Sequence, residues 1–304
     1  MTISYKWLMD YFQQPIPHEK LNLILNSIGL EVESYDEYQE IRGNLAGLIT
    51  GEVLTVEKHP NADRLSVTTV NIGNGQPLQI VCGAPNVAVG QKVIVATVGT
   101  TIYPISGDPI TMKAAKIRSI ESQGMICAED EIGLGTDHNG IKVLPAETSV
   151  GIAVSSLFNP YEDHIISIGL TPNRSDAMSH FGVARDICTW LNHHEGSSIK
   201  PIIRLKSVDT SHSKACPISV TIENQEDCKR YAGAYISGVQ ISSSPAWMQQ
   251  RLKAIGQRPI NSIVDITNYI LHDTGQPLHA FDADRIKGSA IRVKNLSKEP
   301  PSKV

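Results

Sequence analysis

The side chain best suited to chemistry is His279, in the run Gln276-Pro-Leu-His-Ala-Phe-Asp near the carboxyl end of the chain. An imidazole titrates near neutral pH, so it can orient or deprotonate a water molecule. A structural histidine with satisfied hydrogen bonds is the alternative interpretation. The sequence shows no phosphate-cradling Gly-x-x-x-x-Gly-Lys and no Ser-His-Asp arrangement, which argues against nucleotide binding within this chain.

Length and composition narrow the classes of protein. The 304 residues allow two or three domains, and a hydrophobic fraction of 41% is typical of a globular protein. The five cysteines form no Cys-x-x-Cys pair, so we expect reduced thiols in a cytoplasmic protein and no zinc knuckle. The amino terminus does not resemble a signal peptide, and no apolar run reaches the roughly 18 residues of a membrane span.

The elements that position these residues begin with a predicted β-barrel. Apolar and polar residues alternate in four segments, 49–56, 65–72, 78–81 and 92–98. This period of two is typical of half-buried strands, and residues with turn chemistry separate the segments. About five short strands at this spacing predict a small all-β barrel. We place it at residues 40–151, as an insertion in another domain.

The charge of the barrel region is negative. Residues 40–150 contain 8 Lys or Arg against 11 Asp or Glu, a net charge of −3. Phosphate contact usually dominates the affinity for nucleic acid and requires positive surface. The net charge of −4 for the whole chain argues against a nonspecific nucleic-acid coat but not against a specific RNA partner. The one small basic cluster is Lys113, Lys116 and Arg118.

The segments on either side of the barrel are predicted to pack together as an α/β domain, residues 1–39 plus 152–195. Helices are expected at 5–12, with its aromatic residues in the core, at 17–28 before Gly29, and at 181–191; strands are expected at 30–35 and 164–170. The turn at 171–176 has two interpretations. It could bind an anion at a helix N-terminus, or Asn173 and Asp176 could cap while Arg174 pairs with a carboxylate.

Residues 196–304 are predicted to form a third unit. Strands are expected at 218–223, 231–241 and 290–294, and a helix at 244–256 with Ser244 as N-cap and Pro245 at N1. His272 matches no motif and is assigned to the surface. Because a polar run, 297–304, follows the last strand, the sequence is expected to end part-way through a domain.

Two groups of motifs resemble known families. His59-Pro-Asn-Ala-Asp-Arg-Leu, Val81-Cys-Gly-Ala-Pro-Asn-Val and Ser119-Ile-Glu-Ser-Gln-Gly-Met-Ile-Cys-Ala-Glu resemble the oligonucleotide/oligosaccharide-binding (OB) barrel that binds tRNA. With Arg258-Pro-Ile-Asn, Val264-Asp-Ile-Thr-Asn-Tyr and the His279 run, the order of motifs is similar to that in bacterial phenylalanyl-tRNA synthetase β subunits. The implied fold is α+β and multidomain, with an inserted OB barrel followed by the first part of an α+β editing domain of the B3/B4 type.

The resemblance implies a set of site residues. Asn61, Arg64, Ser122 and Met125 fall on motif positions expected to face tRNA. Asn268 and His279, with Arg258 as a further candidate, fall on positions that line the pocket for editing, the hydrolysis of tyrosine attached to the phenylalanine tRNA. The alternatives are that Asn61 and Asp63 form a turn, that Met125 belongs to the core, and that Asn268 caps a turn.

The resemblance also implies the partners and cofactors. These are the phenylalanine tRNA and a synthetase α subunit in an α2β2 heterotetramer, with neither DNA nor a membrane as partner. No cofactor is expected within this segment, whereas the intact enzyme uses ATP and Mg²⁺ on the α subunit. Residues 1–304 alone are expected neither to aminoacylate nor to edit. The competing readings are a free tRNA-binding OB protein and a stand-alone editing hydrolase.

Overall fold

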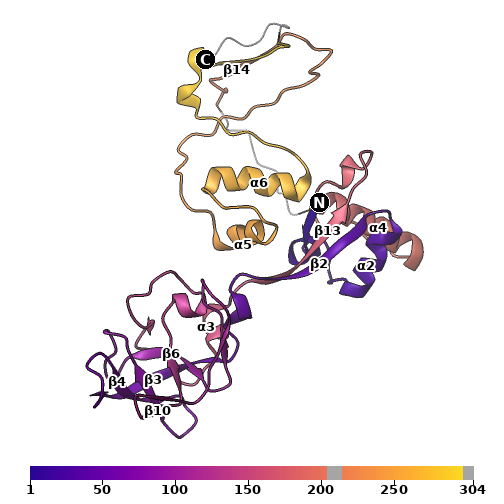
Figure 1. Ribbon diagram of the computed structural model, residues 1–304. Helices are drawn as coiled ribbons and strands as arrows, with labels where there is room; N and C mark the ends of the chain where they lie inside the picture. The colour runs from indigo at the N-terminus through magenta and orange to yellow at the C-terminus, as the bar shows by residue number, and fades with distance from the viewer. Residues whose placement is uncertain (204–213, 297–304) are drawn as a thin grey trace. The chain divides into compact units, whose positions relative to one another are not determined.

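The computed structural model of the chain describes residues 1–203 and 214–296, so the polar run 297–304 lies outside the described residues. The chain divides into two compact units (Figure 1). One comprises residues 37–164, and the other comprises 1–36 with 165–304. Each is described by itself. The domain boundaries drawn from the sequence stay a prediction.

The unit of residues 37–164 is built on an antiparallel barrel sheet. Its strands are β3 (Leu48–Lys58), β4 (Ser66–Asn71), β5 (Leu78–Cys82), β6 (Lys92–Thr97), β11 (Gly124–Ile126) and β12 (Val143–Leu144). They pair in the order β11-β6-β3-β4-β5, with β12 also on β6. The first four follow the alternating segments of the sequence, so those strands are confirmed. The short pairs β7 (Thr101–Ile102) with β8 (Ile110–Thr111), and β9 (Ala115–Ile117) with β10 (Ile120–Ser122), form two hairpins.

Hydrogen bonds bring the two ends of this sheet together. The Gln123 N–H donates to the Gln79 carbonyl at 2.8 Å, which links the start of β11 to β5. Inside, Gly51 on β3 allows close packing, since a Cβ there would lie only 2.8 Å from Val70 Cγ1 and 2.9 Å from Val95 Cγ2. Two clusters of buried, mostly aliphatic side chains fill the interior. The result is a near-closed antiparallel barrel of the OB type, as predicted.

The other unit begins with a three-stranded sheet of order β1-β13-β2. Its elements are β1 (Thr2–Ser4), α1 (Tyr5–Met9), α2 (His18–Ser27), β2 (Glu31–Gln39), β13 (Glu162–Gly169) and α4 (His180–Glu195). Trp7, Leu8 and Tyr11 are 1%, 0% and 7% exposed, so the predicted burial of the aromatic face is confirmed. Gly29, with φ of 77°, ends α2 as expected. The predicted strand at 30–35 lies at the edge of the sheet.

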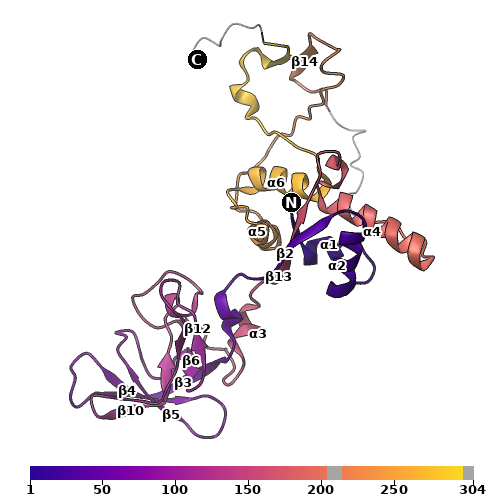
Figure 2. The ribbon, with the colours of Figure 1, turned by 45° about the vertical axis from the view of Figure 1, so that its right-hand side comes forward.

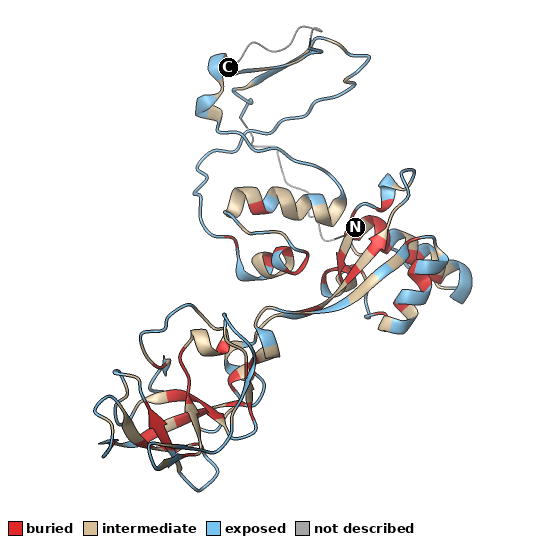
Figure 3. Cartoon of the chain, viewed as in Figure 1, coloured by how far each residue is buried: buried red, intermediate tan, exposed pale blue. Residues whose placement is uncertain are grey.

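Residues 214–296 contain α5 (Ala246–Ala254), α6 (Ser262–Thr274) and a parallel pair of strands, β14 (Ser219–Ile222) and β15 (Ala290–Val293). In Figures 1 and 2 α6 lies beside the amino-terminal end of α4. Residues 214–243 and 276–296 contain no buried residue, whereas red marks the barrel strands and the first sheet in Figure 3. The remaining short helices are α3 (Val154–Phe158) and the 3₁₀ turns Arg42–Leu45, Asp130–Ile132, Ser175–Ala177, Ala283–Arg285 and Lys287–Ser289.

Two expectations for this segment were wrong. Residues 231–241 form no strand, and Ile236 and Ile241 are 74% and 72% exposed. Alternation alone does not make a strand, because the backbone also needs a hydrogen-bonding neighbour, and no described strand lies beside this segment. Ser244 does not cap α5, whose N-cap is Pro245; its hydroxyl donates to Asp265 instead. Asp265 is 1% exposed and also accepts from the Ile260 N–H at 2.8 Å.

Candidate nucleic-acid and hydrolytic sites

The loop that carries Asn61 and Arg64 is tied to the β9–β10 hairpin through His59. His59 is 4% exposed; its Nδ1 accepts from the Asn61 N–H at 3.1 Å, so its Nε2 donates to the Ile117 carbonyl, also at 3.1 Å. Asn61 and Arg64 are both exposed. A buried histidine therefore holds the two exposed candidates beside the hairpin that contains Lys116 and Arg118.

Ser122 and Met125 occupy a different environment. Ser122 is 3% exposed; its hydroxyl accepts from the Val81 N–H at 3.1 Å and donates to the Gly124 carbonyl at 3.0 Å. This hydroxyl joins β10 to β5 across the barrel edge. Met125 is half-buried on β11 and packs against one of the barrel clusters. In this structure the Ser122 hydroxyl therefore makes hydrogen bonds within the barrel and is not exposed on its surface.

A surface pocket of about 440 Å³ lies where these elements meet. Its lining combines thioether, aliphatic and polar side chains and includes Cys82, Met112, Lys113, Ile117, Ser122 and Met125. Burial raises the pKa of the Cys82 thiol, so this cysteine stays protonated at neutral pH. Asn61 and Arg64 do not line the pocket. The candidate tRNA residues thus form two groups, one on an exposed loop and one around a recess.

The charges of the barrel are unevenly distributed. Glu52 and Glu129 form ion pairs with Lys92 at 2.9 Å and Lys142 at 2.5 Å, and Asp130 lies 2.8 Å from His138 Nδ1. By contrast, the cations of the loop and hairpin are exposed and make no ion pair within residues 1–203 and 214–296: Arg64, Lys113, Lys116 and Arg118. Glu121 lies opposite Lys116 in the hairpin register. These four cations are therefore available to phosphates, although the exposed carboxylates Asp63 and Glu121 lie in the same loop and hairpin.

The candidate editing residues come from three different parts of residues 214–296. Asn268 is half-buried on α6, Arg258 is exposed in the connection between α5 and α6, and His279 is exposed beyond α6. The His279 ring has the Phe281 ring as a neighbour, with centroids 6.3 Å apart. His272, assigned to the surface from sequence, is half-buried, and burial lowers its pKa. Its backbone carbonyl also accepts a hydrogen bond from His180.

A group of polar and aromatic residues around Trp7 connects α6 to the amino-terminal elements, and sequence analysis did not identify it as a group. We call it the Trp7 cluster, and its members are Trp7, Tyr11, His180, Arg251, Tyr269 and Asp273. The Trp7 ring is stacked between His180, at 4.2 Å and 16°, and Tyr269, at 4.4 Å and 10°. The indole N–H donates to Asp273 Oδ1 at 2.8 Å, and the Tyr11 hydroxyl donates to the same oxygen at 2.7 Å.

His180 is held neutral within this cluster. Its Nε2 accepts from the Ser4 N–H at 3.0 Å, so its Nδ1 donates to the His272 carbonyl at 2.8 Å. The ring is fully buried, and this burial lowers its pKa to about 3. Burial together with the Asp273 carboxylate raises the pKa of Tyr11 above its usual range. His180 and Tyr11 are therefore both neutral at neutral pH.

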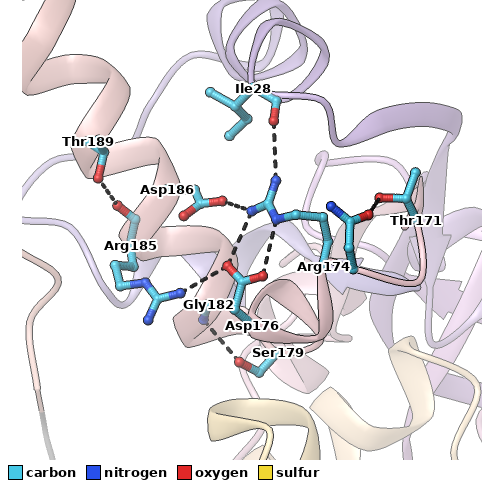
Figure 4. A network of polar contacts seen from close by, with 10 residues as sticks. Ile28, Thr171, Arg174, Asp176, Ser179, Gly182, Arg185, Asp186 and Thr189 are labelled. Atoms are coloured by element: carbon cyan, nitrogen blue, oxygen red, sulfur yellow. Dashed lines mark hydrogen bonds and ion pairs between the residues drawn. The ribbon is translucent and has the colours of Figure 1, made fainter.

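The turn at 171–176 forms a network of ion pairs rather than an open anion site (Figure 4). The Arg174 guanidinium donates to Asp176, to Asp186 and to the Ile28 carbonyl. Arg185 adds a contact to Asp176 at 3.1 Å, and the pairing with Arg174 lowers the pKa of Asp176. The N-cap of α4 is Ser179, whose hydroxyl accepts from the Gly182 N–H. The structural interpretation of Arg174 is therefore confirmed, and Asp176 is not the cap.

Comparison with known proteins gives matches along the whole chain. Residues 48–153 match the family described as putative tRNA binding domain, and residues 227–300 match the B3/4 domain. Three curated relatives carry the name phenylalanine–tRNA ligase β subunit. They come from Bacteroides thetaiotaomicron (51% identical), Porphyromonas gingivalis (46%) and Salinibacter ruber (43%), and each match covers 99% of this chain and 36% of the relative. The resemblance drawn from the motifs is confirmed.

Other comparisons add less. The solved carboxyl-terminal domain of Plasmodium vivax p43 is 24% identical over 34% of this chain and 56% of that chain, with a TM-score of 0.25. In the described part of the chain, no helix is long and apolar enough to cross a membrane. The same residues contain no group of three or more His, Cys, Asp or Glu placed to hold a metal ion.

Proposed function

We propose, from the premise that this chain is related over nearly its whole length to phenylalanine–tRNA ligase β subunits, that it serves in a phenylalanine–tRNA ligase. The chain spans about 36% of the length of these relatives. The observation that carries the proposal is 51% identity across 99% of the chain, together with matches to both a tRNA-binding and a B3/4 domain. The reaction is the ATP-dependent attachment of phenylalanine to its tRNA.

In this proposal the barrel at residues 40–151 binds the phenylalanine tRNA. Arg64, Lys113, Lys116 and Arg118 contact phosphates, since they are exposed and carry no ion pair among the described residues. Asn61 lies on the same loop and can reach the edge of an unpaired base, whereas Met125 offers an apolar face in the recess. Ser122 holds the hairpin to β5. Few cations take part, so the affinity of the barrel alone is modest.

Residues 196–304 contribute to editing in this proposal. Tyrosine differs from phenylalanine by one hydroxyl, and an apolar pocket rejects an added hydroxyl poorly, so a second hydrolytic site restores accuracy. Asn268 on α6 hydrogen-bonds the phenol or the ester, and His279 orients or deprotonates the attacking water. Arg258 is exposed and can approach the tRNA backbone. Because the chain spans about 36% of the length of these relatives, residues 1–304 alone are expected neither to edit nor to aminoacylate.

The partner and cofactors follow from the same premise. A β subunit acts with an α subunit, and we propose an α2β2 heterotetramer that works in the cytoplasm. ATP and Mg²⁺ support the aminoacylation chemistry of the intact enzyme. The amino-terminal α/β domain, 1–39 plus 152–195, carries the barrel as an insertion.

The test uses the full reading frame that encodes this chain, purified with the subunit that accompanies it. We expect the complex to attach labelled phenylalanine to tRNA. We also expect it to hydrolyse tyrosine that has been attached to the phenylalanine tRNA. The variant His279→Ala is expected to lower kcat of that hydrolysis by about 100-fold, the range of general acid–base catalysis, with charging unchanged. His193→Ala, on the last turn of α4, is the matched control. A protein that binds tRNA and has no charging partner would contradict the proposal and support the free binding module.

A further inference from the structure

Helix α6 is positioned by directional contacts rather than by apolar burial. Asp265 is its one buried residue, and the apolar side chains of the helix are half-buried or exposed. At its amino-terminal half, Asp265 accepts from Ser244 and from the Ile260 N–H. Hydrogen bonds weaken steeply as their distance and angle change, so several of them together fix both the rotation and the axial position of a helix. The hydrogen bonds of Asp265 therefore fix the amino-terminal half of α6.

The carboxyl-terminal half of α6 is fixed by the Trp7 cluster. Within one and a half turns, three positions contact α1, the residues that follow it, and α4. Tyr269 stacks on the Trp7 ring, the His272 carbonyl accepts from His180, and Asp273 accepts from Trp7 and Tyr11. The His272 carbonyl is one of the last four of the helix and has no partner within it. His180 supplies that partner from the first turn of α4. The contact is also favourable because the partly positive amino-terminal end of α4 meets the partly negative carboxyl-terminal end of α6.

Arginine 251 extends the cluster to α5. The Arg251 guanidinium donates to Asp10 at 2.5 Å and to the Tyr269 hydroxyl at 3.2 Å. It also lies 5.9 Å from the Trp7 ring centroid and 5.5 Å from that of Trp247, distances at which a cation is attracted to an aromatic face. Both α5 and α6 therefore contact the Trp7 indole ring, through Arg251 and Tyr269 respectively.

The candidate editing residues follow directly from this position. Asn268 precedes Tyr269 on α6, and the segment that leads to His279 starts at Gly275. Gly275 has φ of 80°, and a Cβ there would meet the Ser179 Cβ at 3.4 Å, so the chain leaves α6 in contact with the N-cap of α4. A shift of α6 against Trp7 moves Asn268 and the start of the His279 segment together.

We propose that Trp7 and Asp273 are positioning residues for the hydrolysis of mischarged tRNA, because they hold α6, and with it Asn268, at the orientation that the reaction requires. The inference rests on the proposed function. Neither residue touches the reacting ester; each acts through α6. A displacement of about 1 Å in a residue that orients a substrate can cost about 100-fold in rate, so the loss of these contacts affects the chemical step.

The test is made on the intact complex with Trp7→Ala, Trp7→Phe and Asp273→Asn. For Trp7→Ala we expect kcat for Tyr-tRNA hydrolysis to fall at least about tenfold, while KM for Tyr-tRNA and phenylalanine charging stay within about twofold. Trp7→Phe keeps an aromatic face between His180 and Tyr269, and Asp273→Asn keeps an acceptor, so both are expected to lose less. Trp190→Ala is the matched control, since Trp190 is a half-buried tryptophan that stacks on His194 away from α6.

The outcomes separate this inference from the proposed function. A wild-type complex that hydrolyses no Tyr-tRNA contradicts the proposed function and the inference with it. A wild-type complex that hydrolyses Tyr-tRNA, with Trp7→Ala and Asp273→Asn equally active per folded molecule, contradicts the inference alone. A purely structural role lowers the folded fraction and leaves kcat of the folded protein unchanged. Where Trp7→Ala does not fold, Trp7→Phe and Asp273→Asn are each compared with the wild type. A lowered kcat per folded molecule in either variant supports the inference, and a wild-type kcat in both contradicts it.

Discussion

The barrel and the α5–α6 segment are held in place by different forces. The two apolar clusters of the barrel come entirely from residues 41–158, so its interior is complete within one continuous stretch of chain. Helix α6 buries one carboxylate and depends on residues of α1 and α4 that lie up to 266 positions away. A core made of local apolar pattern is robust and independent of its neighbours. A helix held by a few directional contacts is precise in position but dependent on its partner.

The largest expected effect is in the barrel core. Ile94→Ala removes a fully buried side chain from β6 and leaves a cavity, so we expect a loss of about 2–4 kcal/mol in the unfolding free energy of that unit. Far-UV circular dichroism follows the strands. Tryptophan fluorescence reports only on the other unit, because Trp7, Trp190 and Trp247 all lie outside residues 37–164. Val89→Ala, at a 63% exposed site, is the control. A joint shift of both signals would contradict the independence of the barrel.

The next effect is expected in the Trp7 cluster. Asp273→Ala leaves the buried Trp7 N–H without an acceptor and removes an acceptor of the Tyr11 hydroxyl, which costs about 1–3 kcal/mol. Urea unfolding followed by tryptophan fluorescence measures this loss. Asp282→Ala removes a carboxylate from an exposed site and serves as the control. Equal stability of the two variants would show that apolar contacts alone hold α6.

A smaller effect is expected from pH. The pKa of His180 is lowered to about 3 in the folded chain, from the ordinary value of about 6.5, so only the unfolded state takes up this proton between these values. Stability is therefore complete above pH 6.5 and falls as the pH decreases, by about 1.4 kcal/mol at pH 5.5. The titratable groups whose charge acts on the His180 ring are His272 and Arg251. A His180 imidazole that titrates near pH 6.5 by NMR would contradict this assignment.

The smallest effect on stability is expected at the exposed cations of the barrel. The double variant Lys113→Ala/Lys116→Ala removes exposed charges without ion pairs, so the unfolding free energy should change by less than about 0.5 kcal/mol. Its affinity for tRNA should fall about tenfold near 0.15 M salt, with a shallower salt dependence. Lys142→Ala is the control, since Lys142 is paired with Glu129. An equal loss of tRNA affinity in the control would contradict a local phosphate site.

The same contrast explains what the sequence could predict. The alternation in 49–56, 65–72, 78–81 and 92–98 predicted four barrel strands, because each needs only a neighbour of the same kind nearby in the chain. The aromatic face of α1 was correctly assigned to the core. The sequence did not predict the hydrogen bond from the Trp7 N–H to Asp273, because that contact depends on tertiary packing between residues 266 positions apart.

Other differences have related causes. The segment 231–241 has strand alternation but no pairing partner, and Ser244 has the residue type of a helix cap but donates to a carboxylate 21 residues later. Ser122 carries a motif position expected to face tRNA, yet its hydroxyl bonds within the barrel. In each case the residue type indicated which interactions the residue can make, whereas the partner that it actually contacts depended on the fold. The roles of Asn61, Arg64, Met125, Asn268, His279 and Arg258 stay predictions.

The most direct test of the central claim, that the Trp7 cluster holds α6 while the barrel is independent, is amide hydrogen exchange on the intact chain, wild type against Trp7→Ala. We predict that amides of α6, Ser262–Thr274, exchange at least about tenfold faster in the variant, since their local opening depends on the cluster. Amides of β3, β4 and β6 should exchange at wild-type rates. Unchanged exchange in α6, or an equal increase in the barrel strands, would contradict the account.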